Sequence, residues 1–170
     1  PVGGTPEATR NNLRTALGLL REAGYELKGT RLVHAKTGAP LTVEFLGYDQ
    51  TMERWAAPYK AALERLGVSV SLRIVDAAQY QNRLRSFDFD MTATVFPQSL
   101  SPGNEQRDFW SSRSAEQPGS RNLPGIKNPV VDALVDKIIF AKSREGLVAT
   151  THALDRVLLW NAYVVPQYYF

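Results

Sequence analysis

The chain contains no cysteine and only two histidines among its 170 residues. Without cysteine it can form no disulfide, bind no metal through thiolates and use no cysteine nucleophile. The two histidines, His34 and His152, lie on different predicted elements and lack the paired spacing of metal-binding motifs. The sequence therefore predicts neither a metal site nor a cofactor.

Long apolar runs are also missing. No stretch approaches the roughly 18 apolar residues that a membrane-spanning helix needs. The chain starts at Pro1 without a methionine or a basic-then-apolar signal segment, which is typical of a mature protein or an excised fragment. The lack of cysteine is compatible with a location outside the cytoplasm but does not argue for one.

Catalytic motifs are absent as well. The sequence has no Gly-x-Ser-x-Gly, no phosphate-binding loop and no Gly-x-Gly-x-x-Gly. Two carboxylate pairs could serve acid–base chemistry, but Asp88 and Asp90 flank a strand entry, and Asp132 and Asp136 lie one turn apart on a solvated helix face. Ordinary structural roles explain both pairs, so we expect no enzyme activity and no catalytic residue.

What the chain does have is the composition of a globular protein. It is 44% hydrophobic and 22% charged, with a formal net charge of +3. Its basic residues are scattered and often lie near acidic ones, so a nucleic-acid partner is not expected. This composition and length predict one α/β domain over residues 1–170.

The hydrophobic periodicity predicts helices that alternate with strands. Thr5 and Gly24 bound the first helix. The other predicted helices cover residues 51–66 (with a kink at Pro58), 76–84, 105–110, 129–142 and 144–160. The predicted strands are a hairpin of 31–35 with 41–46, then 68–75, 89–96 and 164–170. Such alternation indicates an α/β class, with a mixed sheet that has some parallel pairs and is flanked by helices.

One long segment, residues 97–127, follows the predicted strand 89–96 and is rich in serine, glycine and proline. Ligands bind outside the carboxyl ends of strands in open α/β sheets, and long connections are usually functional. We therefore expect this segment to line a ligand cleft. The candidate ligand-binding residues are Phe96, Gln98, Ser99, Asn104 and Asn122. The alternative is an ordinary surface loop whose polar residues form turns.

Several pieces of sequence, in order, resemble a known family. They are Ala16–Tyr25 (ALGLLREAGY), Gly38–Thr42, Leu66–Val70, Tyr80 and Arg83 with Phe87–Asp90, and Asn122 with Asn128–Leu134. These pieces resemble the extracellular solute-binding proteins of family 5, the peptide- and nickel-binding receptors of ABC importers. The run Ser99–Trp110 (SLSPGNEQRDFW) is most similar to the oligopeptide branch that also admits microcin C.

The resemblance implies a fragment of a larger protein. Family members have two lobes of the type II periplasmic binding proteins. This chain would be most of the second lobe without its beginning, and the partner lobe of the same polypeptide would be absent. The implied function is capture of oligopeptides in the periplasm for a membrane permease, with the strand end at Val95–Phe96 pairing with the peptide backbone. Deprived of its partner lobe, such a fragment is expected to self-associate through an exposed sheet edge.

One departure from the family pattern concerns the ligand's amine. Related peptide receptors place an aspartate shortly after this strand to hold the ammonium group, whereas this chain has Gln98 or Ser99 there. The contact would then move to a residue such as Glu105 or Asp108. The alternatives that remain are a receptor for a nickel chelate, sugar or opine, a hydrolase, and a purely structural domain.

Overall fold

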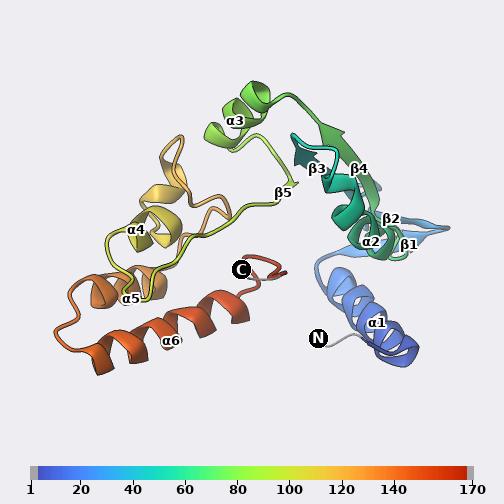
Figure 1. The fold of residues 1–170 in the computed structure, drawn as a ribbon. Helices are drawn as coiled ribbons and strands as arrows, with labels where there is room; N and C mark the ends of the chain where they lie inside the picture. The colour runs from blue at the N-terminus through green and yellow to red at the C-terminus, as the bar shows by residue number, and fades with distance from the viewer. Residues whose placement is uncertain (1–3, 168–170) are drawn as a thin grey trace. The chain divides into compact units, whose positions relative to one another are not determined.

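The computed structural model describes residues 4–167 and divides them into two compact units (Figure 1). The first unit runs up to Gln81 and includes Phe89–Ala93. The second comprises Asn82–Asp88 and the chain from Thr94 onward. Among the described helices, none is long and apolar enough to cross a membrane. The prediction of one lobe over residues 1–170 stays a prediction.

The first unit begins with helix α1 (Pro6–Glu22), which has the predicted boundaries. The side chain of Thr5 accepts a hydrogen bond from the Ala8 amide at 3.1 Å and so caps the helix. The apolar face of α1, which includes Leu13 and Leu17, packs against the core of this unit. The structure therefore confirms the predicted helix. It could be predicted because caps and hydrophobic periodicity depend only on neighbouring residues.

The predicted hairpin of residues 31–35 with 41–46 is wrong. Strand β2 (Arg31–His34) instead pairs antiparallel with β1 (Tyr25–Lys28), a strand that was not predicted from the sequence. A turn of only two residues joins them, and Gly29 in it has a φ of +63°. Such a short turn favours pairing of the nearest segments. Between β2 and the next segment only a single bridge forms, from Val33 to Pro40.

A parallel sheet forms the centre of the first unit. Its strand order is β4 (Ser69–Ile74), β3 (Thr42–Gly47), β5 (Met91–Thr92), with both pairs parallel. Helix α2 (Met52–Glu64) contributes Met52 and Ala56 to the core that surrounds Phe45. This helix continues through Pro58 as one element. The α/β class is confirmed, with parallel pairs in this sheet and an antiparallel pair in the hairpin.

Strand β5 is much shorter than the predicted strand 89–96. Its pairing with β3 covers only Met91 and Thr92. The carboxylate of Asp90 accepts a hydrogen bond from the Glu44 amide at 2.8 Å, so a side chain replaces a ladder bond at the strand's start. Residues 93–95 are exposed, and no other described strand pairs with them. Helix α3 (Ala77–Arg85) precedes this segment and is capped by Asp76, as predicted.

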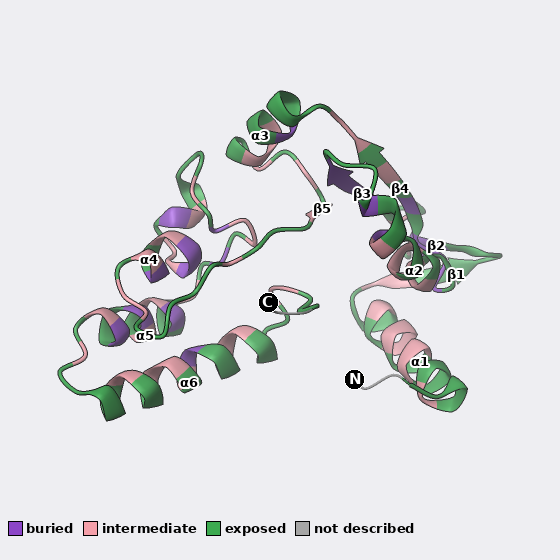
Figure 2. Cartoon of the chain, viewed as in Figure 1, coloured by how far each residue is buried: buried purple, intermediate pink, exposed green. Residues whose placement is uncertain are grey.

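The second unit is built from helices α4 (Glu105–Trp110), α5 (Pro129–Ile139) and α6 (Arg144–Trp160), with the short 3₁₀ helix η1 (Ser114–Glu116). Its buried core lies between α4, α5 and α6 (Figure 2). The core residues are Phe109, Trp110, Ile126, Val131, Val135, Ile138 and Leu154. Asn128 caps α5 through the Val130 amide. The predicted strand 164–170 is wrong for residues 164–167, which have no strand structure, and residues 168–170 lie outside the described part.

Candidate ligand-binding site

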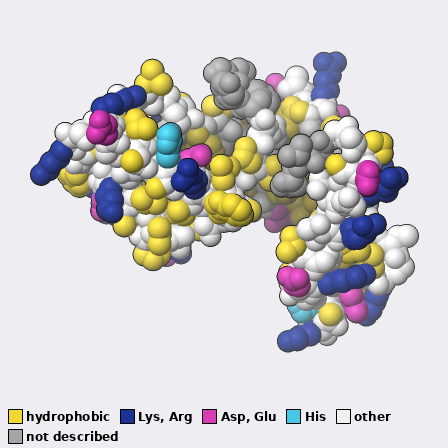
Figure 3. Space-filling view, turned by 90° about the horizontal axis from the view of Figure 1, so that it is seen from below, with side chains coloured by type: hydrophobic (Ala, Val, Ile, Leu, Met, Phe, Trp, Pro, Cys, Tyr) yellow, Lys and Arg dark blue, Asp and Glu magenta, His cyan; other side chains and the backbone are white. Residues whose placement is uncertain are grey.

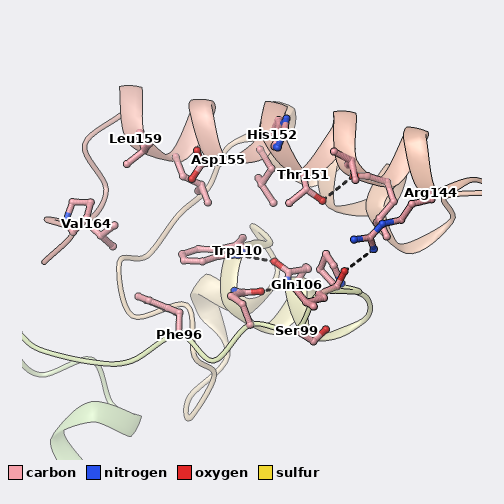
Figure 4. Close-up of a pocket in the computed structure, with 18 residues that line it drawn as sticks. Phe96, Ser99, Gln106, Trp110, Arg144, Thr151, His152, Asp155, Leu159 and Val164 are labelled. Atoms are coloured by element: carbon pink, nitrogen blue, oxygen red, sulfur yellow. Dashed lines mark hydrogen bonds between the residues drawn. The ribbon is translucent and has the colours of Figure 1, made fainter. Parts of the chain in front are cut away.

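The second unit contains a pocket of about 490 Å³ between helix α6 and the segment from Phe96 to Trp110 (Figure 4). Every lining residue belongs to this unit. The segment contributes Phe96, Gln98, Ser99, Leu100, Pro102, Gln106 and Trp110. Helix α6 and the chain after it contribute Arg144, Leu147, Val148, Thr151, His152, Leu154, Asp155, Leu158, Leu159, Val164 and Pro166. The pocket is therefore apolar in its walls, with a small number of polar groups.

Aromatic packing holds Phe96 at the pocket wall. The Phe96 ring lies 4.7 Å from the Trp110 ring and 5.7 Å from the Phe109 ring, centroid to centroid. Phe109 and Trp110 are buried members of the core. Offset and edge-to-face contacts at these distances are favourable, so the two core rings fix the position of Phe96.

A chain of three hydrogen-bonding side chains orients Gln98. The indole nitrogen of Trp110 can only donate, and it donates to Oε1 of Gln106 at 3.0 Å. The Nε2 group of Gln106 must then face the other way, and it donates to Oε1 of Gln98 at 2.7 Å. Gln106 is only 3% exposed, which makes this arrangement costly to break. The amide NH₂ of Gln98 has no acceptor among residues 4–167, so it is free to donate to a ligand.

A backbone contact ties the two walls of the pocket together. Nη1 of Arg144 on α6 donates to the carbonyl oxygen of Leu100 at 2.7 Å, which spans 44 residues of sequence. Between Gln98 and Leu100, the exposed Ser99 lines the pocket, and its hydroxyl oxygen accepts a bond from the Ser101 amide at 3.2 Å. The bond from Arg144 thus fixes the segment that carries Gln98 and Ser99.

The other two predicted residues lie outside the pocket. Asn104 is exposed, just before α4, and its side chain makes no capping bond. Asn122 is completely buried. Its amide donates to the Ser111 and Ile126 carbonyls at 2.9 and 3.0 Å, and its oxygen accepts from the Ile126 amide at 2.9 Å.

Both donors of the Asn122 amide and its oxygen thus hold backbone groups of residues 111–126. The structure brings Phe96, Gln98 and Ser99 together and leaves Asn104 and Asn122 apart from them. Ligand contact by any of the five stays a prediction, and the geometry of Asn122 fits a structural residue.

The sequence did not predict that α6 forms one side of the pocket. Arg144, Thr151 and Asp155 line it, and their spacings of seven and four residues place them on one face of the helix. This spacing was readable in the sequence. Nothing local, however, indicates that this face would lie opposite residues 96–102.

The two acidic residues suggested for an amine contact are already engaged. The carboxylate of Glu105 accepts the Gly103 amide at 2.8 Å, and this backbone hydrogen bond lowers the pKa of Glu105 below its ordinary value of 4.5. Asp108 pairs with Arg121, whose Nε lies 3.3 Å from the carboxylate. Neither residue lines the pocket.

The carboxylate pairs singled out from the sequence hold structural contacts. Asp88 lies 2.9 Å from Nε of Arg83, and Asp90 bonds the Glu44 amide. Asp132 accepts both the amide and the hydroxyl of Ser112, at 2.8 and 2.6 Å. In the described part of the chain, no group of three or more His, Asp or Glu residues could hold a metal ion.

Known proteins resemble this chain over nearly its whole length. It is 55% identical over 169 residues to the probable peptide-binding protein YejA of Agrobacterium fabrum. The matched region covers 99% of this chain but only 28% of that protein. The peptidoglycan-binding protein YepA of the same species is 39% identical over 162 residues, 95% of this chain and 26% of that protein. The chain thus spans less than a third of the length of these relatives.

A solved structure shows the same fold. The oligopeptide-binding protein AppA of Bacillus subtilis, in complex with a nonapeptide, superposes with a TM-score of 0.75 at 19% identity, over 88% of this chain and 30% of that one. At this identity the likeness concerns the fold alone. Residues 2–117 match the middle region of the bacterial extracellular solute-binding proteins, family 5, and the chain therefore belongs to that family.

Proposed function

We propose that this chain is part of the substrate-binding protein of an ABC importer and that its pocket takes up a peptide. The observation that carries the proposal is the pocket itself, where Phe96, Gln98 and Ser99 lie opposite a face of α6 that combines leucine and valine side chains with a few polar and charged ones. Ligand sites are typically apolar clefts with few polar groups that set orientation. The family, and the peptide-binding names of relatives such as YejA, support the same ligand class.

Each part of the pocket has a role in binding a peptide. The free NH₂ of Gln98 and the hydroxyl of Ser99 can donate to the carbonyl oxygens of a ligand backbone. The Phe96 and Trp110 rings offer apolar surface to its side chains.

The full-length protein would act without catalysis. In this proposal a second lobe of the same polypeptide closes over the ligand by hinge motion in the periplasm, and the closed form docks on a membrane permease. The role of the chain is to bind and release, and it needs neither a metal nor a cofactor.

Native mass spectrometry of the gently purified full-length protein tests the proposal. We expect peptides at one per protein, and loss of affinity for them in Gln98→Ala. Gln117→Ala is a matched control, because Gln117 is an exposed glutamine of the same unit that does not line the pocket. Protein that carries no peptide, and that binds none from a peptide pool after ligand-free refolding, would contradict the proposal.

A second candidate is a receptor for a non-peptide solute. It is favoured by the fold of NikZ from Campylobacter jejuni, solved in complex with Ni(L-His), which superposes with a TM-score of 0.76 at 17% identity over 89% of this chain and 30% of that one. Thermal shifts of the ligand-free protein with metal chelates and sugars, but not with peptides, would favour this candidate.

A further inference from the structure

Strand β4 forms an edge of the parallel sheet in the first unit. The strand order β4-β3-β5 gives β4 one neighbour, and no other described strand pairs with it (Figure 1). The Ser69 amide donates to the carbonyl of Leu41, just before β3, at 2.9 Å, which fixes the alternation of backbone groups along the strand. The backbone groups of every second residue therefore point away from the sheet, and these residues are Val70, Leu72 and Ile74.

An unpaired strand edge of this kind is a template for association with another chain. Natural proteins protect such edges with prolines, bulges or charged side chains. Strand β4 has six residues and no proline, and Arg73 is its only charged residue. Within the described part of the chain, no hydrogen bond reaches the outward backbone groups of Leu72 and Ile74. Any protection of this edge must therefore come from outside the strand.

A lysine of helix α2 covers part of the edge. Nζ of Lys60 donates to the carbonyl oxygen of Val70 at 2.8 Å and to Oε1 of Glu64 at 2.6 Å. Glu64 follows Lys60 by one helical turn, so this ion pair holds the ammonium group beside the strand. A hydrogen bond from a charged donor is stronger than one between neutral groups. The outward carbonyl of Val70 is thus occupied by a side chain.

The bond from Lys60 competes with strand pairing at this position. A strand that adds to β4 needs the Val70 carbonyl as the acceptor for one of its own amides. Such a strand would displace the ammonium group from an oxygen that belongs to a buried residue. Lys60 therefore makes β4 an edge that stays open, instead of one that a further strand completes.

The rest of the edge is self-complementary. Two β4 strands related by a two-fold axis run antiparallel, and with Leu72 opposite its counterpart, Val70 lies opposite Ile74 of the second copy. In this register Ser71 lies opposite Arg73 of the second copy, so the two arginines do not face each other. The chain has a net charge of only +3, and acidic and basic side chains are interspersed on the face shown in Figure 3, so long-range repulsion between copies is weak. The obstacle to pairing is local.

We propose that the outer edge of β4 is an association surface for a second copy of this chain, and that Lys60 keeps it closed by capping the Val70 carbonyl. With the lysine in place, antiparallel pairing lacks the hydrogen bond from Ile74 of each copy to Val70 of the other. Without it, the two three-stranded sheets join into one. This inference gives the self-association expected from the sequence a particular surface, and it does not depend on which ligand the protein binds.

Sedimentation velocity of the full-length protein over a range of concentrations tests the proposal. Lys60→Met keeps a long, helix-forming side chain but removes the donor and its charge. We expect it to strengthen self-association at least about tenfold relative to the wild type, because each copy regains a backbone acceptor. Lys137→Met is the matched control, since Lys137 is an exposed lysine in helix α5 of the other unit, and it should change nothing.

A second substitution separates edge pairing from aggregation of unfolded protein. Ser71→Arg adds a cation opposite Arg73 of the second copy, at an exposed position whose neighbour on β3 is Glu44. Lys60→Met combined with Ser71→Arg should return to the self-association of the wild type. Its melting temperature should not fall below that of Lys60→Met alone, because the added cation lies beside an acidic residue.

Hydrogen exchange at the edge shows what covers it. The amides of Leu72 and Ile74 should exchange fast in the wild type and become protected in the associated Lys60→Met protein. Protection of both amides in monomeric wild type would show that another segment of the full-length polypeptide pairs with β4, and would overturn the proposal. A Lys60→Met protein that associates no more than the wild type would also overturn it, as would association that Ser71→Arg does not reverse.

Discussion

The amide oxygen of Gln98 accepts a hydrogen bond from Nε2 of the buried Gln106 at 2.7 Å, and this contact leaves the NH₂ end of the Gln98 side chain free. This orientation arises because the indole N–H of Trp110 donates to Oε1 of Gln106, which turns Nε2 of Gln106 toward Gln98. A glutamine that the sequence marks only as polar is thereby given a fixed orientation by a core tryptophan.

Replacing Gln106 by leucine should lower both stability and ligand affinity. The substitution leaves the buried indole N–H of Trp110 without an acceptor, which costs about 1–3 kcal/mol of unfolding free energy. It also frees Gln98 to rotate. Urea unfolding and peptide titration of the full-length protein measure the two effects, with Gln117→Ala as the control. Unchanged unfolding would mean that the Trp110–Gln106 bond does not form.

Substitution of Asn122 by alanine should destabilise the protein. It removes three hydrogen bonds from a completely buried position and leaves the Ser111 and Ile126 carbonyls without this donor, at a cost of about 2–4 kcal/mol. Thermal unfolding measures the loss. Asn104→Ala is the control, because Asn104 is exposed and caps nothing. A normal melting temperature with abolished ligand binding would instead support the predicted ligand contact of Asn122.

Gly67→Ala should destabilise the first unit. An added Cβ would lie 2.8 Å from the backbone nitrogen of Leu32, and the φ of +86° is unfavourable for alanine. The expected cost is more than about 1 kcal/mol, since strain and a backbone clash act together. Gly38→Ala provides a matched control, because its φ is +73° but no atom lies within 4 Å of the added Cβ. If denaturant unfolding showed the same loss of unfolding free energy in both variants, the backbone strain alone would explain it, and the clash at Gly67 would contribute nothing.

The pH dependence of stability should respond to Glu105. Its pKa is lowered in the folded protein because its carboxylate accepts the Gly103 amide. A lowered folded pKa contributes stability that is fully present above the unfolded value, near 4.5, and that is lost as the pH falls through the folded value. Unfolding free energies from pH 6 to pH 3 should therefore decline less steeply in Glu105→Gln. A slope equal to that of the wild type and of the Glu145→Gln control would contradict this.

Helix boundaries and caps were predictable because their causes are local. Thr5, Asp76 and Asn128 cap the helices that follow them within three residues of sequence. The alternation of Val68–Val75 likewise predicted β4. The resemblance to family 5 rested on the order of such local pieces, and the match over residues 2–117 bears it out.

Pairing partners were harder to predict. The sequence predicted a pairing of residues 31–35 with 41–46, whereas a tighter turn pairs β2 with β1. The predicted strand 89–96 is several residues longer than β5, because apolar character indicates a strand but does not supply the neighbouring strand. For the candidate site, the segment 96–99 was found, whereas its opposite wall on α6 was not.

By itself, the sequence determined which segments of this protein are helical, which caps begin them and which glycines end them, and the family to which the chain belongs. Only the tertiary structure decided that Arg144 meets the carbonyl of Leu100 and that Asn122 is enclosed in its own loop. The physical reason is range: helical periodicity and capping act over a few residues. A pocket wall instead depends on packing between segments more than 40 residues apart, and no local pattern encodes that packing.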